Sequence, residues 1–276
     1  PRSRRYPSCS VDDWRSYDSV AERYERVAAP RLVEPARDLV EAAGVVPGLR
    51  VLDVGTGTGV AAGAAAAALG GDGVVVGVDV SLPMLRVARS ARPGVRVAAA
   101  RAFDLPFRDG AFDVVLASFV LSHFPRPETA LFDMLRVLRP GGRLGVTNRG
   151  PGEDDLQRTW RELVEAAVGV ELARSAVQQA VPWEERFADR RALEEALHRA
   201  GLRRVRSELR RYRFRYTIEE FLEERTASAT GRFVRGMLGE AGFARFLERA
   251  RAAYLERFAD PLTDLREVVL AVGAKP

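Results

Sequence analysis

One stretch of nine residues constrains this chain more than any other. Residues 51–59, VLDVGTGTG, begin with an apolar run that leads into Asp53 and continue with three glycines separated by threonines. The apolar run predicts a buried parallel strand, and the alanine-rich residues 60–69 predict a helix behind it. Glycine tolerates unusual φ angles and lets a ligand approach the backbone, while the helix start offers unpaired N–H groups. The stretch therefore predicts a turn that holds the polar part of a nucleotide-like cofactor.

The alternation of strand and helix continues along the chain. Further strands are predicted at residues 74–78, 95–99, 113–118 and 143–147, the last preceded by a turn at residues 140–142. Strands that alternate with helices form a parallel sheet covered on both faces, and such sheets bind ligands outside the carboxyl ends of their strands. Asp79, the region of Phe103 and residues 118–123 all lie at those ends, so we expect them to form one site with the glycine turn.

The second half of the chain adds helices and closes the sheet. Residues 202–216 predict a sixth strand and residues 267–272 a seventh, which makes an α/β chain with a seven-stranded, mostly parallel sheet. Helical segments are expected at residues 11–43, 150–200 and 217–259. We expect residues 1–276 to form a single domain in which these segments cap the carboxyl edge and enclose an apolar pocket.

The charge of the chain bears on its partners. The net charge of +5 favours a nucleic-acid partner, yet Lys275 is the only lysine among 43 basic residues, and 38 acidic residues balance most of the arginine. In the sixth strand, Arg211, Arg213 and Arg215 alternate with aromatic residues. This alternation fits a half-buried strand with solvated arginines, or a nucleic-acid surface with stacking aromatics. We expect a small-molecule partner, with a nucleic acid as the alternative.

Cysteine content and hydropathy bear on location. Cys9 is the only cysteine, which excludes an internal disulfide framework and a cysteine-based zinc site. No apolar run is long enough to span a bilayer, and the first residues carry no signal-peptide pattern. We expect a cytoplasmic protein with no membrane span and no metal site. Its oligomeric state does not follow from the sequence.

Four successive motifs resemble those of class I S-adenosylmethionine-dependent methyltransferases: VLDVGTGTG, VDVSLPMLRVAR, FDLPFRDGAFDVVLASFVLSHF and LRVLRPGGRL. The resemblance covers about residues 15–148 and is nearest to the small-molecule branch that includes ubiquinone/menaquinone-biosynthesis-type enzymes. It implies a doubly wound, Rossmann-like sheet with helices on both faces. It also implies S-adenosyl-L-methionine as cofactor, S-adenosyl-L-homocysteine as product, and in-line transfer of the methyl group to the O, C or N atom of a hydrophobic acceptor.

The resemblance assigns the methionine end of the cofactor to the glycine turn and the N-terminal helices. The residues concerned are Tyr17, Tyr24, Asp53, Gly55, Thr56 and Gly57. The turn lies against the methionine part, and Asp53 binds its amino group directly or through water. One of the two tyrosines reaches the cofactor carboxylate.

The adenosine end is assigned to the next strand ends. Asp79 accepts hydrogen bonds from both ribose hydroxyls, while Val80 and Met84 line the adenine pocket. Ala102 and Phe103 resemble the adenine-binding loop, in which a backbone N–H meets a ring nitrogen. The residue before this alanine is usually an aspartate that contacts the exocyclic amine, and Arg101 departs from the family pattern at this position.

The end of the fourth strand is assigned to the reaction centre. Ser118 and Phe119 are expected beneath the sulfonium, and His123 follows them. The ordinary pKa of histidine suits a general base near neutrality, which makes His123 the candidate catalytic residue. A histidine that only shapes this turn explains the sequence as well. His198, in a charged helix, is expected at the surface or in packing.

Three alternative functions remain open. Residues 57–62 also fit the dinucleotide pattern G-x-G-x-x-A, which is typical of NAD-binding domains. A nucleic-acid methyltransferase would share the cofactor site but bind RNA or DNA with strong salt dependence. A protein of the same fold that catalyses a non-methylating reaction would produce no S-adenosylhomocysteine, since the fold alone does not determine the function.

Overall fold

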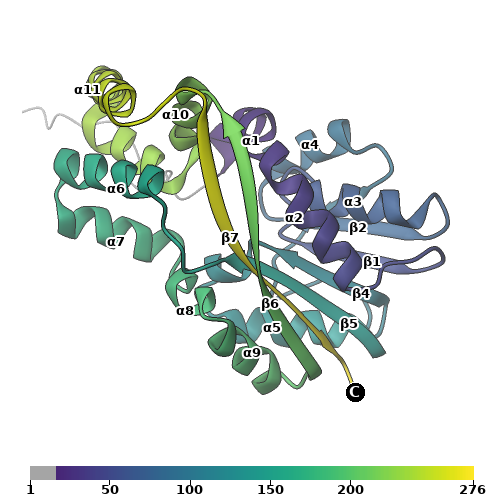
Figure 1. The fold of residues 1–276 in the computed structure, drawn as a ribbon. Coiled ribbons are helices and arrows are strands. Elements are labelled where there is room, and N and C mark those ends of the chain that lie inside the picture. Colours follow the sequence, from purple (N-terminus) through teal and green to yellow (C-terminus); the bar gives the residue numbers. More distant parts are fainter. Residues whose placement is uncertain (1–16) are drawn as a thin grey trace, which may run out of the picture.

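Residues 17–276 are described by the structure, a computed structural model, and they form a seven-stranded sheet flanked by helices (Figure 1). The strand order is β3-β2-β1-β4-β5-β7-β6. Strands β1 to β5 pair in parallel, whereas β7 runs antiparallel to both β5 and β6. The predicted α/β fold, with a mostly parallel sheet of seven strands and helices on both faces, is confirmed.

The elements follow the predicted order. The strands are β1 Arg50–Val54, β2 Val74–Asp79, β3 Arg96–Ala99, β4 Phe112–Ser118, β5 Leu138–Arg149, β6 Arg203–Tyr216 and β7 Leu262–Ala274. The helices are α1 Ala21–Val27, α2 Ala29–Ala42, α3 Val60–Leu69, α4 Leu82–Ala91, α5 Pro127–Val137, α6 Asp155–Val168, α7 Val170–Ala180, α8 Glu184–Ala188, α9 Arg190–Arg199, α10 Ile218–Ala227 and α11 Ala229–Arg257. Two short 3₁₀ helices, η2 Asp18–Val20 and η3 Leu121–His123, precede α1 and follow β4.

Strand β5 differs from its prediction. It begins at Leu138, and the turn expected at residues 140–142 lies inside the strand. Pairing passes from Phe112 with Leu138 to Val114 with Arg143, so residues 139–142 lie opposite Asp113 alone. Gly141 has a φ of +75°, and a Cβ on Gly142 would lie 2.8 Å from the carbonyl oxygen of Asp113. The glycines permit a bulge, and a bulge uses the same residue types as a turn.

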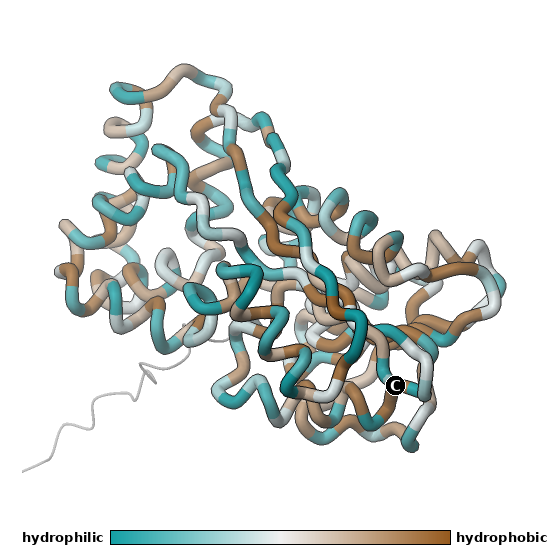
Figure 2. Tube along the Cα trace, turned by 60° about the horizontal axis from the view of Figure 1, so that its bottom comes forward, coloured by the Kyte–Doolittle hydropathy of each residue, from teal (hydrophilic) through white to brown (hydrophobic). Residues whose placement is uncertain are grey.

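The helices bury apolar residues on both faces of the sheet. One core contains Leu39 of α2 and Ala62 of α3 against the strands, and the other contains Leu131 of α5, Phe187 of α8 and Leu193 of α9. The central strands are mostly apolar, and the outer helices alternate between apolar and polar residues (Figure 2). In the described range, no helix combines the length and hydropathy needed to cross a membrane.

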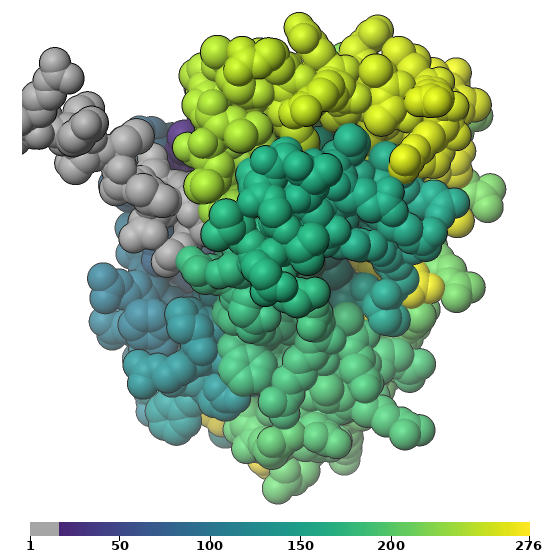
Figure 3. Space-filling view, turned by 90° about the vertical axis from the view of Figure 1, so that its left-hand side faces the viewer, coloured from purple at the N-terminus to yellow at the C-terminus, as the bar shows by residue number. Residues whose placement is uncertain are grey.

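A third apolar cluster lies beyond the carboxyl edge of the sheet. It joins α6, α7, α10 and α11 and includes Trp160, Phe221 and Tyr254. Helix α11 packs on α6 and α7, and Figure 3 shows this side of the molecule. We call these four helices the cap. Part of the segments expected to form a cap packs on the sheet instead, namely α2, α8 and α9. Residues 11–16 of the first expected segment lie outside the described residues.

Two strands connect the sheet to the cap. Strand β5 pairs with β7 only from Val268 onward, so residues 262–267 of β7 pair with β6 alone. This two-stranded ribbon rises past the sheet to α10 and α11 (Figure 1). Tyr212 and Tyr216 are buried on its inner face while Arg211, Arg213 and Arg215 are exposed, as expected for a half-buried strand with solvated arginines.

Candidate active site

The glycine turn after β1 has the backbone geometry that its sequence predicts. Gly55, Gly57 and Gly59 have φ angles of +70°, +53° and +84°, which residues with a side chain rarely adopt. The N–H groups of Gly55 and Thr56 both donate to the carbonyl of Val78, at 2.8 and 2.9 Å. A Cβ on Gly55 would lie 2.3 Å from a methyl group of Val120, whereas a Cβ on Gly57 would meet open space. Gly55 is therefore required by packing and Gly57 faces room for a ligand.

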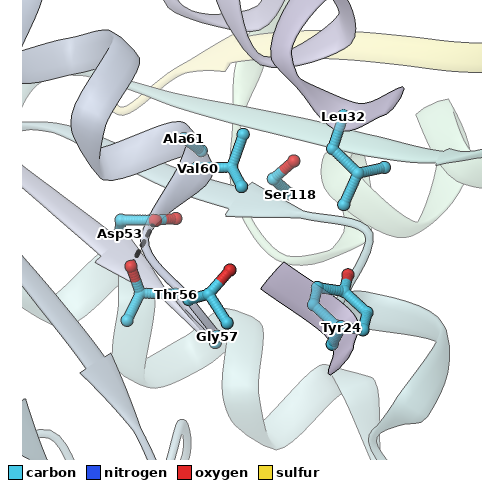
Figure 4. A pocket seen from close by; sticks show the side chains of 10 residues that line it. Tyr24, Leu32, Asp53, Thr56, Gly57, Val60, Ala61 and Ser118 are labelled. Atoms are coloured by element: carbon cyan, nitrogen blue, oxygen red, sulfur yellow. Dashed lines mark hydrogen bonds between the residues drawn. The ribbon is translucent and has the colours of Figure 1, made fainter. Parts of the chain in front are cut away.

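Asp53 lies fully buried at the base of this turn. Its Oδ2 accepts a hydrogen bond from the Thr56 hydroxyl at 2.7 Å (Figure 4). It accepts a second one from the Ala62 N–H at 3.0 Å. Its Oδ1 has no hydrogen-bond partner among the residues that the structure describes. Burial raises the pKa of Asp53 to about 7, although the two hydrogen bonds lower it. A buried carboxylate oxygen without a partner is costly, so this oxygen favours a cationic or N–H donor from a ligand.

A cavity of about 50 Å³ opens at this carboxylate. It is lined by Tyr24, Leu32, Asp53, Gly55, Thr56, Gly57, Thr58, Val60, Ala61 and Ser118 (Figure 4). The hydroxyl of Thr58 is also buried and without a partner in the described part of the chain. The cavity is smaller than the roughly 300 Å³ or more of typical ligand pockets. It suits the amino-acid end of S-adenosylmethionine, with the nucleoside outside it.

The nucleoside would lie over the end of β2. Oδ2 of Asp79 accepts a hydrogen bond from the Gly57 N–H and Oδ1 accepts one from the Ser81 N–H, both at 2.9 Å. Burial raises the pKa of Asp79. Each oxygen keeps a lone pair for a further donor, such as a ribose hydroxyl. Val80 and Phe103, 69% and 50% exposed, place apolar surface in solvent at the neighbouring strand ends.

The other predicted adenine-site residues are less accessible. Met84 and Ala102 are buried, at 3% and 7% exposure, so contact with a ligand through the side chain is limited. Arg101, which replaces the usual aspartate, is exposed and lies with its guanidinium carbon 5.9 Å from the centre of the Phe103 ring. Arg101 and Asp104 form an isolated β-bridge that shapes this loop.

The end of β4 is held to β5 by hydroxyl groups. Ser118 Oγ lies 3.1 Å from Thr147 Oγ1, and the Phe119 N–H donates to the Thr147 carbonyl at 3.0 Å and approaches its hydroxyl at 3.2 Å. Phe119 has a φ of +53°, which is strained for a bulky residue. Such strain persists only where the surroundings enforce it, and it is typical of functional sites.

His123 lies in a cluster of aromatic and cationic side chains. The centre of its ring is 6.0 Å from that of Tyr17, which is 5.7 Å from that of Tyr24. The guanidinium of Arg232 stacks on Tyr17 with its carbon 4.2 Å from the ring centre. Burial lowers the pKa of His123 to about 4, and the charges of Arg232 and Arg149 act in the same direction. The ring is therefore neutral at physiological pH and a weak base, which weighs against general-base catalysis near neutrality.

The structure brings the predicted residues to one edge of the sheet and adds others. The residues near the site that sequence reasoning missed include Leu32, Thr58, Thr147, Arg149 and Arg232. Thr58 could have been predicted, because it lies within the glycine-rich motif at residues 51–59. The others come from α2, β5 and α11, whose approach to β4 depends on packing between distant elements.

Comparison with known proteins agrees with this geometry. Residues 52–146 match the family described as a methyltransferase domain. This part of the chain is similar to methyltransferase domains. The expected resemblance to class I S-adenosylmethionine-dependent methyltransferases is thus confirmed.

Individual proteins are similar in sequence to part of this chain. A demethylmenaquinone methyltransferase of Renibacterium salmoninarum is 48% identical over 110 residues, which cover 40% of this chain and 45% of that protein. Nocamycin O-methyltransferase of Saccharothrix syringae is 32% identical over 149 residues, 52% of each chain. The chain thus spans about half the length of these curated relatives.

The fold is shared more widely. Haemonchus contortus phosphoethanolamine N-methyltransferase 2, solved with phosphomonomethylethanolamine and S-adenosylhomocysteine, matches with a TM-score of 0.58 at 20% identity. The match covers 98% of this chain and 62% of that one. At this identity the comparison shows the fold alone.

Proposed function

We propose that this protein transfers the methyl group of S-adenosylmethionine to a small, largely hydrophobic acceptor. The observation that carries the proposal is the unpartnered Oδ1 of Asp53, which faces a cavity between the glycine turn and Tyr24. A primary ammonium group is the donor that such an oxygen accepts best, and the methionine end of the cofactor carries one.

The residues around the cavity fit the cofactor from one end to the other. Asp53 and Thr58 would bind the amino-acid group, Asp79 the ribose, and Val80 and Phe103 the adenine. The sulfonium of the bound cofactor supplies an activated methyl group. The protein then has to align the acceptor behind that methyl group and exclude water, and orientation of this kind contributes about 7–11 kcal/mol at best.

The acceptor is proposed to be small because of what lies beside the cofactor site. Tyr17, Tyr24 and Leu32 close over the end of β4, and the cap helices stand beyond them. The curated relatives named above are methyltransferases of small molecules by name, which supports the same class of acceptor. We further propose that the protein acts in the cytoplasm.

Asp79 provides the first test. Asp79→Ala removes two acceptor positions from the ribose site, and hydrogen bonds to a charged group contribute about 1.5–3 kcal/mol each. We expect the affinity for S-adenosylhomocysteine, measured by calorimetry, to fall by at least about a hundredfold. Asp72→Ala, in the exposed turn before β2, is the matched control and should bind normally. An unchanged affinity of Asp79→Ala would contradict the site assignment.

Product analysis separates the alternatives. The protein is incubated with S-adenosylmethionine and either a panel of phenols, enols and amines or a mixture of RNA and DNA. S-adenosylhomocysteine formed with the small molecules supports the proposal, while formation with nucleic acid alone supports the nucleic-acid alternative. A chemical change in an acceptor without S-adenosylhomocysteine indicates a non-methylating reaction.

A further inference from the structure

Arg149 occupies a position beside the reaction centre that the proposed function leaves unexplained. It is the last residue of β5, two residues after Thr147, whose hydroxyl contacts Ser118 and the backbone of Phe119. Alternate residues of a strand point to the same side, so Arg149 and Thr147 share one side of β5. The charge of Arg149 affects the pKa of both Tyr24 and His123. Arg149 therefore lies within electrostatic range of two residues at the end of β4 and the cavity.

The guanidinium of Arg149 is weakly engaged. Its nearest acid is Glu184, at 3.7 Å between Nε and Oε1, which is too long for a hydrogen bond. It makes no hydrogen bond within residues 17–276, and its side chain is 47% exposed. Arg31 and Arg266, by contrast, both pair closely with Glu224, at 3.1 and 2.8 Å. Arg149 thus retains donors for a ligand.

The surroundings of His123 are electropositive. Burial is the main cause of the low pKa of His123, and two cations, Arg232 on α11 and Arg149 on β5, lower it further, while the hydrogen bond to the backbone of Ala180 raises it. No carboxylate among the described residues raises it. A neutral acceptor that had to lose a proton here would find a weak base, whereas an acceptor that arrives ionised would find cations.

We propose that the acceptor binds as an oxyanion, a phenolate or an enolate, whose charge pairs with the guanidinium of Arg149. This inference rests on the proposed function and names its acceptor class. The acceptor oxygen forms a bond to the methyl carbon as the carbon–sulfur bond breaks. The electron pair of that bond remains on sulfur as a thioether, the opposite charges of oxyanion and sulfonium cancel, and no proton moves in the step. His123 then positions the acceptor as a neutral hydrogen-bonding group.

The test uses the whole protein loaded with S-adenosylhomocysteine and two matched probes. The first is 4-nitrophenol, whose phenolate absorbs in the visible, at a mildly acidic pH where most of the free probe is protonated. The second is 4-nitroanisole, which has the same ring but cannot ionise. The variants are Arg149→Gln, Arg149→Lys and, as control, Arg199→Gln at an exposed position on α9. Thermal unfolding checks that each variant is folded.

We expect the wild-type protein to bind 4-nitrophenol with growth of the phenolate band. Arg149→Gln should bind it about tenfold or more weakly, Arg149→Lys should retain part of the affinity, and Arg199→Gln all of it. Affinity for 4-nitroanisole should be the same in wild type and Arg149→Gln. Binding of 4-nitrophenol in its neutral form, equal affinity in Arg149→Gln, or no binding to the wild type would each overturn the inference.

Failure of this inference and failure of the proposed function give different results. If S-adenosylhomocysteine binds and the phenolate is not recognised, the methyltransferase proposal remains and the acceptor is not an oxyanion held by Arg149. If S-adenosylhomocysteine itself does not bind, the proposed function fails and the inference fails with it.

Discussion

Replacing Glu224 with glutamine removes the negative charge at the contact between the cap and the sheet. Glu224, on α10, accepts hydrogen bonds from Arg266 of β7 at 2.8 and 3.1 Å and from Arg225 at 3.1 Å. It also forms an ion pair with Arg31 of α2 at 3.1 Å. The side chains of Glu224 and Arg31 are 8% and 9% exposed, so water compensates little for a lost partner.

The magnitude follows from these contacts. Three hydrogen bonds to a charged carboxylate, at about 1.5–3 kcal/mol each, set an upper bound on the gross loss. The variant no longer has to bury a charged carboxylate at this position, so the net loss of unfolding free energy is smaller than this bound. Removal of one partner from a buried ion pair typically costs about 3–5 kcal/mol, and we expect Glu224→Gln to reduce the free energy of unfolding by about that amount.

The effect also has a defined pH dependence. Although burial alone raises it, the neighbouring arginines bring the pKa of Glu224 well below its ordinary value of 4.5. A carboxylate with a depressed pKa stabilises the folded state above its unfolded pKa, and this contribution is lost as the pH falls. The difference between wild type and Glu224→Gln should be full at pH 7 and should shrink as the pH falls below about 4.5.

Urea unfolding followed by circular dichroism measures both quantities. Glu195→Gln, on the exposed surface of α9 where Glu195 pairs with Arg199, is the control and should leave the unfolding curve unchanged. A loss below about 1 kcal/mol at neutral pH, or a difference that persists in acid, would refute the reasoning.

Three further predictions concern the site. His123→Ala should lower turnover but keep the shape of the pH–rate profile between about pH 5 and 8, because the pKa of His123 is about 4. If the variant instead loses an ionisation near neutrality, His123 acts as a general base. Cofactor affinity should rise with pH through about 7 as Asp53 ionises, and calorimetry of Asp53→Asn should show weak binding without this rise. Gly57→Ala should lower the free energy of unfolding by about 1–2 kcal/mol through backbone strain and should sharply weaken cofactor binding. Gly55→Ala should lower the free energy of unfolding further, because its Cβ would clash with Val120. Equal losses of unfolding free energy in the two variants would contradict the packing argument.

Much of the fold was predictable because local patterns and tertiary packing agree in it. α3 has the predicted bounds and β1 lies at the predicted apolar run, because local pattern and tertiary packing favour the same structure in both segments. β5 was misjudged at its start because proline and two glycines signal both a turn and a bulge. The last strand was predicted at residues 267–272 but begins at Leu262, where pairing with β6 continues beyond the rest of the sheet. That extension depends on pairing with β6, and the sequence of residues 262–266 alone does not indicate it.

The positions of the candidate cofactor residues were predictable from the sequence, and those of the residues around His123 were less so. Asp53 and Asp79 occupy strand ends that chain order already places together. Arg232 belongs to α11, more than a hundred residues after His123, and only the packing of the cap brings the two within electrostatic range. The weak basicity of His123 was likewise invisible, because it results from burial and from these distant cations.

The ribbon of β6 and β7 has a consequence for how such a chain diverges. Tyr216 and Leu262 face each other across the ribbon, so residues 217–261 leave and return at adjacent points. A segment attached in this way can be lengthened, shortened or exchanged like an insert in a hairpin, provided that the exchange keeps the ion pairs of Glu224 with Arg31 and Arg266. The match to the methyltransferase-domain family covers residues 52–146 and ends before this insert begins. If the proposed function holds, recombination at Tyr216 and Leu262 therefore offers a route to new acceptor specificity while the candidate cofactor site stays unchanged.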